Sequence, residues 1–134
     1  MRDQIRFKIG KEEKNIQEKW IEIPEGTEHI QMMIEMPEEF RYMAFLFLED
    51  PKKEIRFQKL LGYGQQNPGI GKSTKDTTIG GVPGEIYPGT WKIGIGIFTE
   101  YVAQKLGEQT GEIVLTVSDQ IGRASCRERV SSPV

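Results

Sequence analysis

The glycine-rich segment that ends at Ser73 is the part of the sequence closest to a known chemical motif. Residues 64–73 read Gly-Gln-Gln-Asn-Pro-Gly-Ile-Gly-Lys-Ser and end like a phosphate-binding loop. That loop needs a glycine five residues before Gly71, so that successive backbone N–H groups surround the phosphates, and this position is Gln66. It also needs a following helix, and residues 74–78 are poor helix formers. We therefore interpret the segment as a shaped surface loop.

Histidine, cysteine and paired carboxylates offer little further chemistry. His29 is the only histidine and Cys126 the only cysteine, so no disulfide can form within the chain and a metal site would lack convergent ligands. Alternation around His29 favours a solvent-facing position on a strand. The pairs Glu12-Glu13 and Glu38-Glu39 lie in charged connections and are expected to be solvated. We predict no catalytic, cofactor-binding or metal-ligating residue in this chain, hence no cofactor and no enzyme activity.

Aromatic side chains could form a stacking platform for a sugar ring. The candidates are Trp20, Tyr63, Tyr87 and Trp91. Trp20 and Trp91 each begin an alternating apolar series, which favours the core for both. Tyr63 and Tyr87 stay as candidates, because they lie in the glycine-rich region.

Composition and charge narrow the class of protein. The chain has 134 residues, 37% of them hydrophobic, and a net charge of -2, which is typical of one ordinary domain. The balanced charge excludes a strongly basic surface for nucleic acid or an anionic membrane. The longest apolar run, from Met43 to Leu48, is far shorter than the ~20 residues that span a bilayer. The first eight residues have no secretory signal pattern, so we expect a cytoplasmic protein without nucleic-acid or membrane partners.

Period-two alternation indicates strands along most of the chain. Residues 43–48 are continuously apolar and predict a central strand covered on both faces, whereas the charged residues 11–19 favour a solvated connection. Gly62 to Gly89 holds eight glycines and three prolines, which predicts a long shaped loop with at most short strands. We predict an all-β fold, an antiparallel β-sandwich of jelly-roll type with about seven to eight strands. The alternating segments are residues 4–9, 20–23, 30–36, 54–57, 90–97 and 112–117.

The segment 90–97 alternates most clearly. Trp91, Ile93, Ile95 and Ile97 share one face, and this face predicts core positions. The other face carries Gly94 and Gly96 with Lys92, and a face lined by glycine lets another backbone approach closely.

The alternation stops after Asp119. Residues 121–130 read Ile-Gly-Arg-Ala-Ser-Cys-Arg-Glu-Arg-Val, with no period and no apolar face, and are similar to a translated sequencing-library adaptor. We interpret residues 120–134 as an artefactual disordered tail, with an ordinary basic tail as the alternative, and residues 1–119 as one domain. We expect the natural reading frame to continue beyond Asp119.

A family resemblance lies in the second half of the chain. The pattern of paired Pro-Gly turns before a tryptophan-led strand resembles the signature of the β-sandwich that precedes the catalytic domain in CehA/McbA-type (carbaryl-hydrolase-like) PHP metallohydrolases. Ile79 and Gly81 depart from the family's usual proline and tyrosine. The matching positions are Pro83-Gly84, Pro88-Gly89 and Trp91, with Leu48-Glu49-Asp50-Pro51 and Ile23-Pro24-Glu25-Gly26 upstream.

The resemblance implies a division of labour. In that family, histidines and carboxylates of a PHP domain after the sandwich hold the hydrolytic metals, beginning at a His-x-His motif that is absent here. We therefore expect a non-catalytic accessory domain of a PHP-type, phosphoesterase-like metal-dependent hydrolase, whose partner is the catalytic domain of the same polypeptide. The alternative is a stand-alone carbohydrate- or protein-binding module, similar to pre-peptidase C-terminal-like domains, that binds a glycan or small molecule through Gly62 to Gly89.

Overall fold

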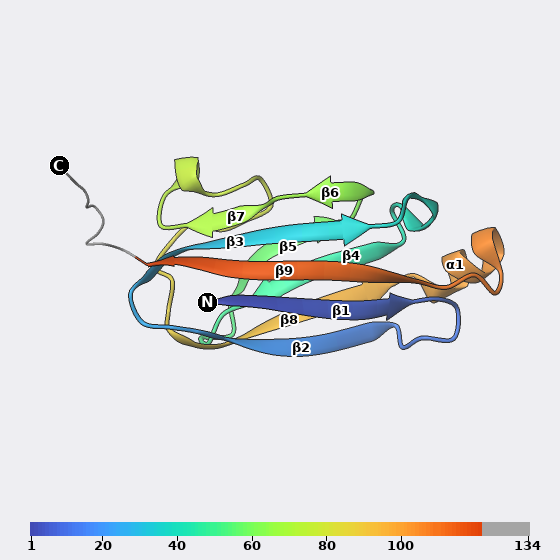
Figure 1. Cartoon of the computed structure of the whole chain (residues 1–134), viewed down its shortest axis with the longest axis horizontal. Coiled ribbons are helices and arrows are strands. Elements are labelled where there is room, and N and C mark those ends of the chain that lie inside the picture. Colours follow the sequence, from blue (N-terminus) through green and yellow to red (C-terminus); the bar gives the residue numbers. More distant parts are fainter. Residues whose placement is uncertain (122–134) are drawn as a thin grey trace.

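Two antiparallel sheets pack face to face in the computed structural model, which describes residues 1–121 (Figure 1). This arrangement confirms the predicted all-β sandwich. The described residues form nine strands rather than seven to eight, because β6 and β7 are short strands within the predicted loop. The tail that we interpreted as an artefact lies outside the described residues from position 122 onward.

The first sheet has five strands, all joined by antiparallel pairing. Its long central strand β3 pairs with β9 on one side and with the two short strands on the other. The strands run in the order β1 (Arg2–Ile9), β9 (Gly111–Ile121), β3 (Thr27–Met36), with β6 (Gly64–Gln66) and β7 (Gly69–Gly71) both beside β3.

The second sheet has four strands, all joined by antiparallel pairing. Short helices connect the strands at the ends of the sandwich, and α1 follows β8 directly (Figure 1). No helix among residues 1–121 is long and apolar enough to cross a membrane. The order is β2 (Ile16–Ile23), β8 (Gly89–Ile97), β4 (Ala44–Glu49) and β5 (Ile55–Leu60); the helices are η1 (Glu38–Phe40), η2 (Thr74–Asp76) and α1 (Thr99–Leu106).

The core lies between the sheets and follows the predicted period-two pattern. Trp91 is completely buried and is the largest side chain of the core, which confirms its predicted position. Burying a side chain of this size stabilises a fold by about 2–3 kcal/mol. The other residues of its face are buried with it, namely Ile93, Ile95 and Ile97.

Strand β2 departs from the prediction in two ways. It begins at Ile16, inside the segment predicted to be a solvated connection, because that segment pairs with β8 from Gly96 onward. Trp20 is 60% exposed, so its predicted core position is wrong. The physical reason is phase: Ile21 and Ile23 point inward, and Trp20 lies between inward positions on the opposite face.

Strand β4 is an interior strand of its sheet, as predicted, but it is not covered on both faces. Leu46 and Leu48 are buried in the core, whereas Phe45 and Phe47 on the outer face are half-buried. No second layer of described residues covers that outer face, so a continuously apolar segment presents aromatic rings to solvent.

The glycine-rich segment closes one side of the sandwich. Its residues 77–84 connect the edge of one sheet to the edge of the other through backbone hydrogen bonds. Val82 N donates to Arg56 O at 2.8 Å on β5, and Gly84 N donates to Gly71 O at 3.1 Å on β7. The predicted shaped loop with short strands is confirmed.

Candidate functional site

An open groove lies on the outer face of the four-stranded sheet, at the end next to α1. It has a volume of about 870 Å³. We call it the α1 groove. Its lining is mainly apolar and comes from β2, β4, β8 and the start of α1. The lining residues are Asn15, Ile16, Phe45, Phe47, Gly96, Ile97, Phe98, Thr99, Glu100 and Tyr101.

Strand register produces the floor of the groove. Ile16 of β2 lies opposite Gly96 of β8, and Gly96 lies opposite Phe45 of β4. Phe45 in turn lies opposite Leu60 on β5. Since paired residues of antiparallel strands share a face, one row across the sheet contains only apolar side chains and a glycine.

Two glycines shape this floor differently. A Cβ on Gly94 would lie 2.0 Å from Cζ of Phe47, so the Phe47 ring lies directly over that glycine. A Cβ on Gly96 would meet only the carbonyl oxygen of Phe45, at 4.0 Å. The sequence predicted close approach of another backbone at these glycines. The structure instead packs an aromatic ring on one and leaves space at the other.

The wall formed by α1 is fixed by polar contacts. Thr99 Oγ1 donates to Asn15 Oδ1 at 2.7 Å, and Ile97 N donates to Asn15 O at 2.6 Å. These contacts hold the loop before β2 against the start of the helix. Phe98, which is 46% exposed, and Tyr101 therefore project from a fixed support.

An ion-pair cluster borders the groove on the same face. Lys92 Nζ lies 3.1 Å from Glu18 Oε2 and 3.5 Å from Glu49 Oε1. The hydrogen bond with Glu18 is the main cause that raises the pKa of Lys92 above its ordinary value of 10.5. A second hollow of about 440 Å³ continues from Ile16 past Glu18 to the exposed Trp20.

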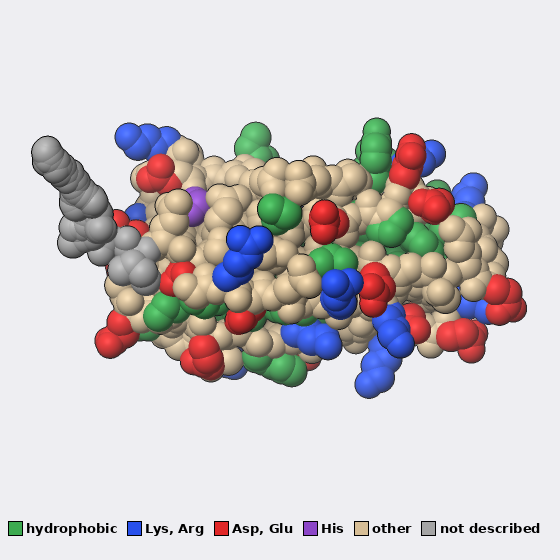
Figure 2. Space-filling model, in the orientation of Figure 1, with side chains coloured by type: hydrophobic (Ala, Val, Ile, Leu, Met, Phe, Trp, Pro, Cys, Tyr) green, Lys and Arg blue, Asp and Glu red, His purple; other side chains and the backbone are tan. Residues whose placement is uncertain are grey.

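The outer face of the five-stranded sheet is different. Figure 2 shows Lys, Arg, Asp and Glu side chains spread over this face, with hydrophobic side chains only in small separate patches. Arg6 and Glu112 form an exposed pair across β1 and β9 at 3.1 Å. The apolar α1 groove, by contrast, lies on the four-stranded sheet.

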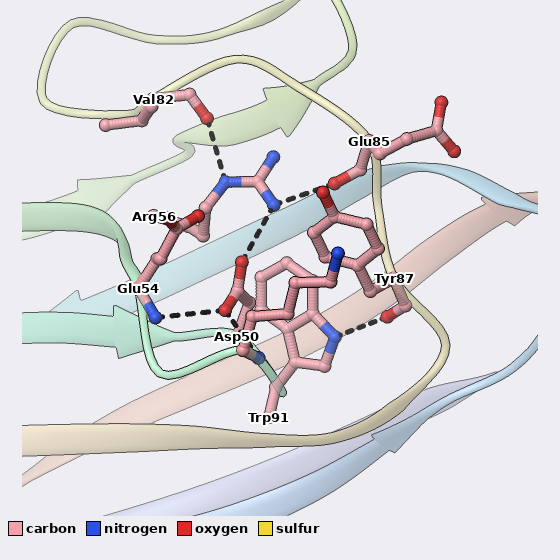
Figure 3. Close-up of polar contacts among 8 residues, drawn as sticks. Asp50, Glu54, Arg56, Val82, Glu85, Tyr87 and Trp91 are labelled. Atoms are coloured by element: carbon pink, nitrogen blue, oxygen red, sulfur yellow. Dashed lines mark hydrogen bonds and ion pairs between the residues drawn. The ribbon is translucent and has the colours of Figure 1, made fainter.

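A buried ion pair lies at the other end of the four-stranded sheet (Figure 3). Arg56 Nη1 lies 3.3 Å from Asp50 Oδ2, and these side chains are 4% and 0% exposed. The other carboxylate oxygen, Oδ1, accepts hydrogen bonds from the backbone N–H groups of Lys52 and Glu54 at 2.9 and 3.0 Å. Asp50 thus fixes the turn between β4 and β5 and also holds the guanidinium of Arg56.

Arg56 holds the glycine-rich segment against this pair. Its Nε donates to Val82 O at 3.1 Å, and its Nη1 donates to Glu85 O at 2.7 Å. The guanidinium carbon lies 5.5 Å from the centroid of the Trp91 ring, and Trp91 Nε1 donates to Tyr87 O at 2.7 Å (Figure 3). One arginine therefore connects the core tryptophan, the β4–β5 turn and the segment that closes the sandwich.

Several of the residues that carried the family resemblance lie around this anchor. Asp50 pairs with Arg56, and Trp91 packs against it. A Cβ on Gly84 would lie 3.4 Å from Arg56 Nη2, and one on Gly89, where φ is +124°, would lie 3.5 Å from Pro51. In this chain the motif builds a structural anchor. Sequence reasoning did not single out Arg56, although Asp50 at the end of a strand was an available signal.

The remaining sequence candidates are not brought together. His29 lies on the outer face of its sheet, the predicted side, but its ring is partly covered: Nε2 is 3.1 Å from Asp76 O, and a Cβ on Gly69 would lie 2.6 Å from Cε1. The glycines of the phosphate-loop-like segment therefore make room for this ring.

The two tyrosines proposed for sugar stacking do not share a site. Lys52 Nζ lies 4.2 Å from the centroid of the Tyr87 ring. Tyr87 also lines a hollow of about 450 Å³ beside Arg56, and Tyr63 does not line that hollow. Residues 1–121 contain no group of three His, Cys, Asp or Glu placed to hold a metal ion.

Comparisons with known proteins find similarity only among solved structures. No family model matches the sequence, and no curated protein matches it. Among solved structures, the chain is similar to the periplasmic inhibitor of g-type lysozyme PliG from Aeromonas hydrophila, with a TM-score of 0.45 and 10% sequence identity. The alignment covers 89% of this chain and 86% of that chain.

Proposed function

We propose that this chain is a non-catalytic accessory domain of a PHP-type, phosphoesterase-like metal-dependent hydrolase, and that its α1 groove contacts the catalytic domain of the same polypeptide. The observation that carries this proposal is the exposed apolar surface of the groove. Aromatic residues are enriched in the cores of protein interfaces, and a contiguous apolar patch on a small domain is typical of an interaction site.

The parent family is proposed from the sequence motif, and the motif residues also contribute to the fold that presents the groove. Several positions that resemble the CehA/McbA-type sandwich lie around Arg56, whose contacts hold the β4–β5 turn and the glycine-rich segment together. We expect these contacts to hold the sheet in one conformation, which would reduce the entropy cost of docking at the groove. In this proposal the accessory domain positions the catalytic domain or its substrate, and the hydrolytic chemistry belongs to the catalytic domain.

A binding experiment in trans tests the docking role. The catalytic domain encoded after the sandwich in the uninterrupted reading frame is expressed separately and titrated with this chain by calorimetry. We expect binding that Phe45→Ser or Phe98→Ser weakens at least about tenfold, as for aromatic residues at the centre of interfaces. Val114→Ser, on the outer face of the five-stranded sheet, is the matched control and should leave the affinity unchanged.

Two results would contradict this proposal. The first is a reading frame without a His-x-His motif after the sandwich. The second is binding in trans that Phe45→Ser and Phe98→Ser leave intact. A separate assay of this chain alone, with manganese, zinc or iron and a generic phosphodiester, should give no turnover; metal-dependent turnover would also contradict a non-catalytic role.

The alternative function is a stand-alone binding module for carbohydrate or protein. The observation that favours a carbohydrate is the exposed Trp20 next to Glu18, because an aromatic ring beside hydrogen-bonding groups can stack on a sugar. Calorimetry against a glycan panel tests it, with Trp20→Ala beside Tyr63→Ala and Tyr87→Ala. Affinity that is lost only in Trp20→Ala would place the sugar on the four-stranded sheet.

A further inference from the structure

The α1 groove and the hollow beside it carry an excess of negative charge. Their lining includes the three carboxylates Glu13, Glu18 and Glu100 and one ammonium, Lys14. Lys105, whose Nζ lies 5.7 Å from the centroid of the Tyr101 ring, reduces this excess from two charges to one. Lys92 is shared between Glu18 and Glu49, so including Lys92 and Glu49 leaves the excess unchanged. Among the described residues, Glu100 makes no ion pair, and it lies in the lining of the groove itself.

The aromatic rings of the groove add to this preference. Phe45, Phe47, Phe98 and Tyr101 line it, and the face of an aromatic ring attracts a cation. The chain already places one cation in this way, since Lys105 Nζ lies 5.7 Å from the centroid of the Tyr101 ring. Because Lys105 already lies over Tyr101, a cation that enters with an apolar body would meet the Glu100 carboxylate and the phenylalanine rings of the lining.

The size and openness of the groove indicate the kind of ligand. A volume of about 870 Å³ is at the upper end of the range for ligand pockets, about 300–1,000 Å³. The site is open along the sheet and continues past Ile16 into the second hollow. At Gly96 the absent side chain lets the backbone of a partner approach the floor. These features fit several neighbouring side chains of an extended or helical segment.

We infer that the α1 groove binds a segment of a protein partner in which a Lys or Arg side chain lies next to apolar side chains. The apolar side chains cover Phe45 and Phe98, and the cation reaches the carboxylate of Glu100. The charge complementarity favours this occupant over a neutral or acidic one. The inference rests on the proposed role of the groove as a docking surface and specifies the chemistry of the segment that docks there.

Three capped tetrapeptides test this charge preference directly. They share the sequence Leu-Trp-Xaa-Leu and differ only in Lys, Gln or Glu at the third position. Each is titrated into the full chain with ¹⁵N labelling, and amide shifts at Gly96, Phe98 and Glu100 report occupancy. We expect the Lys peptide to bind about fivefold more tightly than the Gln peptide and the Glu peptide to bind most weakly. Added salt should reduce these differences.

Two variants test whether Glu100 causes the preference for the Lys peptide. Glu100→Lys should reverse the order of the three peptides, whereas Glu35→Lys, on the outer face of the five-stranded sheet, should preserve it. Equal affinities, tightest binding of the Glu peptide, or no shifts at these amides would overturn the inference. Failure here is distinct from failure of the proposed function: equal peptide affinities together with Phe45-dependent binding of the catalytic domain would overturn only the charge preference.

Discussion

The two ends of the four-stranded sheet depart in opposite ways from the usual arrangement of apolar side chains inside and polar side chains outside. At the end where β4 leads into β5, a carboxylate and a guanidinium are buried, and Trp91 covers them from the core. At the α1 end, aromatic residues such as Phe98 are exposed around an open groove. The same strands β4 and β8 connect both ends.

The difference shows where the chain uses its charged groups for stability and where it leaves surface free for contact. The buried pair is almost fully satisfied, because Asp50 accepts three hydrogen bonds and Arg56 donates to two backbone carbonyls as well as to the carboxylate. A buried charge that is paired in this way fixes one arrangement of the surrounding loops. The exposed aromatic residues stabilise the fold much less, and the docking role proposed for the groove gives them a function.

The largest expected difference in stability is between the alanine variants of the two tryptophans. Trp91→Ala should lower the free energy of unfolding by about 3–5 kcal/mol, because it leaves a cavity in the core and removes the contact with Arg56. Trp20→Ala, on the exposed face, should change it by less than about 1 kcal/mol. Urea denaturation followed by circular dichroism measures both. Stability of Trp91→Ala within 1 kcal/mol of the parent would refute the core assignment.

Breaking the buried pair should have the next largest effect. Asp50→Ala leaves the Arg56 guanidinium buried without its counter-ion, which should cost about 3–5 kcal/mol in unfolding free energy. The matched exposed control is Glu112→Ala, which removes the surface pair with Arg6 and should cost about 0–1 kcal/mol. If both variants lose the same stability by urea denaturation, the buried pair is not an anchor.

The fold could be predicted from the sequence because period-two burial is a local signal. Trp91 and the isoleucines after it alternate in phase with the core, and the structure buries all four. Trp20 was misplaced because the apolar alternation of β2 runs through Ile21 and Ile23, one residue out of phase with the tryptophan. The pairing of residues 16–19 with β8 was also not predictable, because it depends on a neighbour distant in sequence.

The candidate site was harder to predict, for a related reason. A continuous apolar run such as residues 43–48 indicates burial on both faces, but which face is covered depends on how many layers the fold has. The structure has two layers, so Phe45 and Phe47 face outward. The pair of Asp50 with Arg56 required a turn that brings the two residues together, and neither charge alone indicates it.

Adding a methyl group at each glycine of β8 probes the floor of the groove. Gly94→Ala places a Cβ against the Phe47 ring, so the ring must move and stability should fall by about 1–3 kcal/mol. Gly96→Ala meets open space and should leave stability unchanged or raise it by about 0.5–1 kcal/mol. It should still weaken binding in the groove. Equal thermal shifts for the two variants would show that the Phe47 ring does not depend on Gly94.

The smallest expected effect concerns Lys92, which lies on the outer face between the two ends. Glu18 and Glu49 raise its pKa in the folded state, so the folded chain holds this proton more tightly than the unfolded chain. Its contribution to stability is therefore complete below about pH 10.5 and is lost as the pH rises through the folded pKa. Lys92→Met should show less decline in unfolding free energy than the parent between about pH 9 and 11.5. Lys11→Met should also show less decline than the parent, because Glu108 raises the pKa of Lys11 in the same direction. If only Lys11→Met flattens the profile, the cluster around Lys92 does not stabilise the surface between the anchor and the groove.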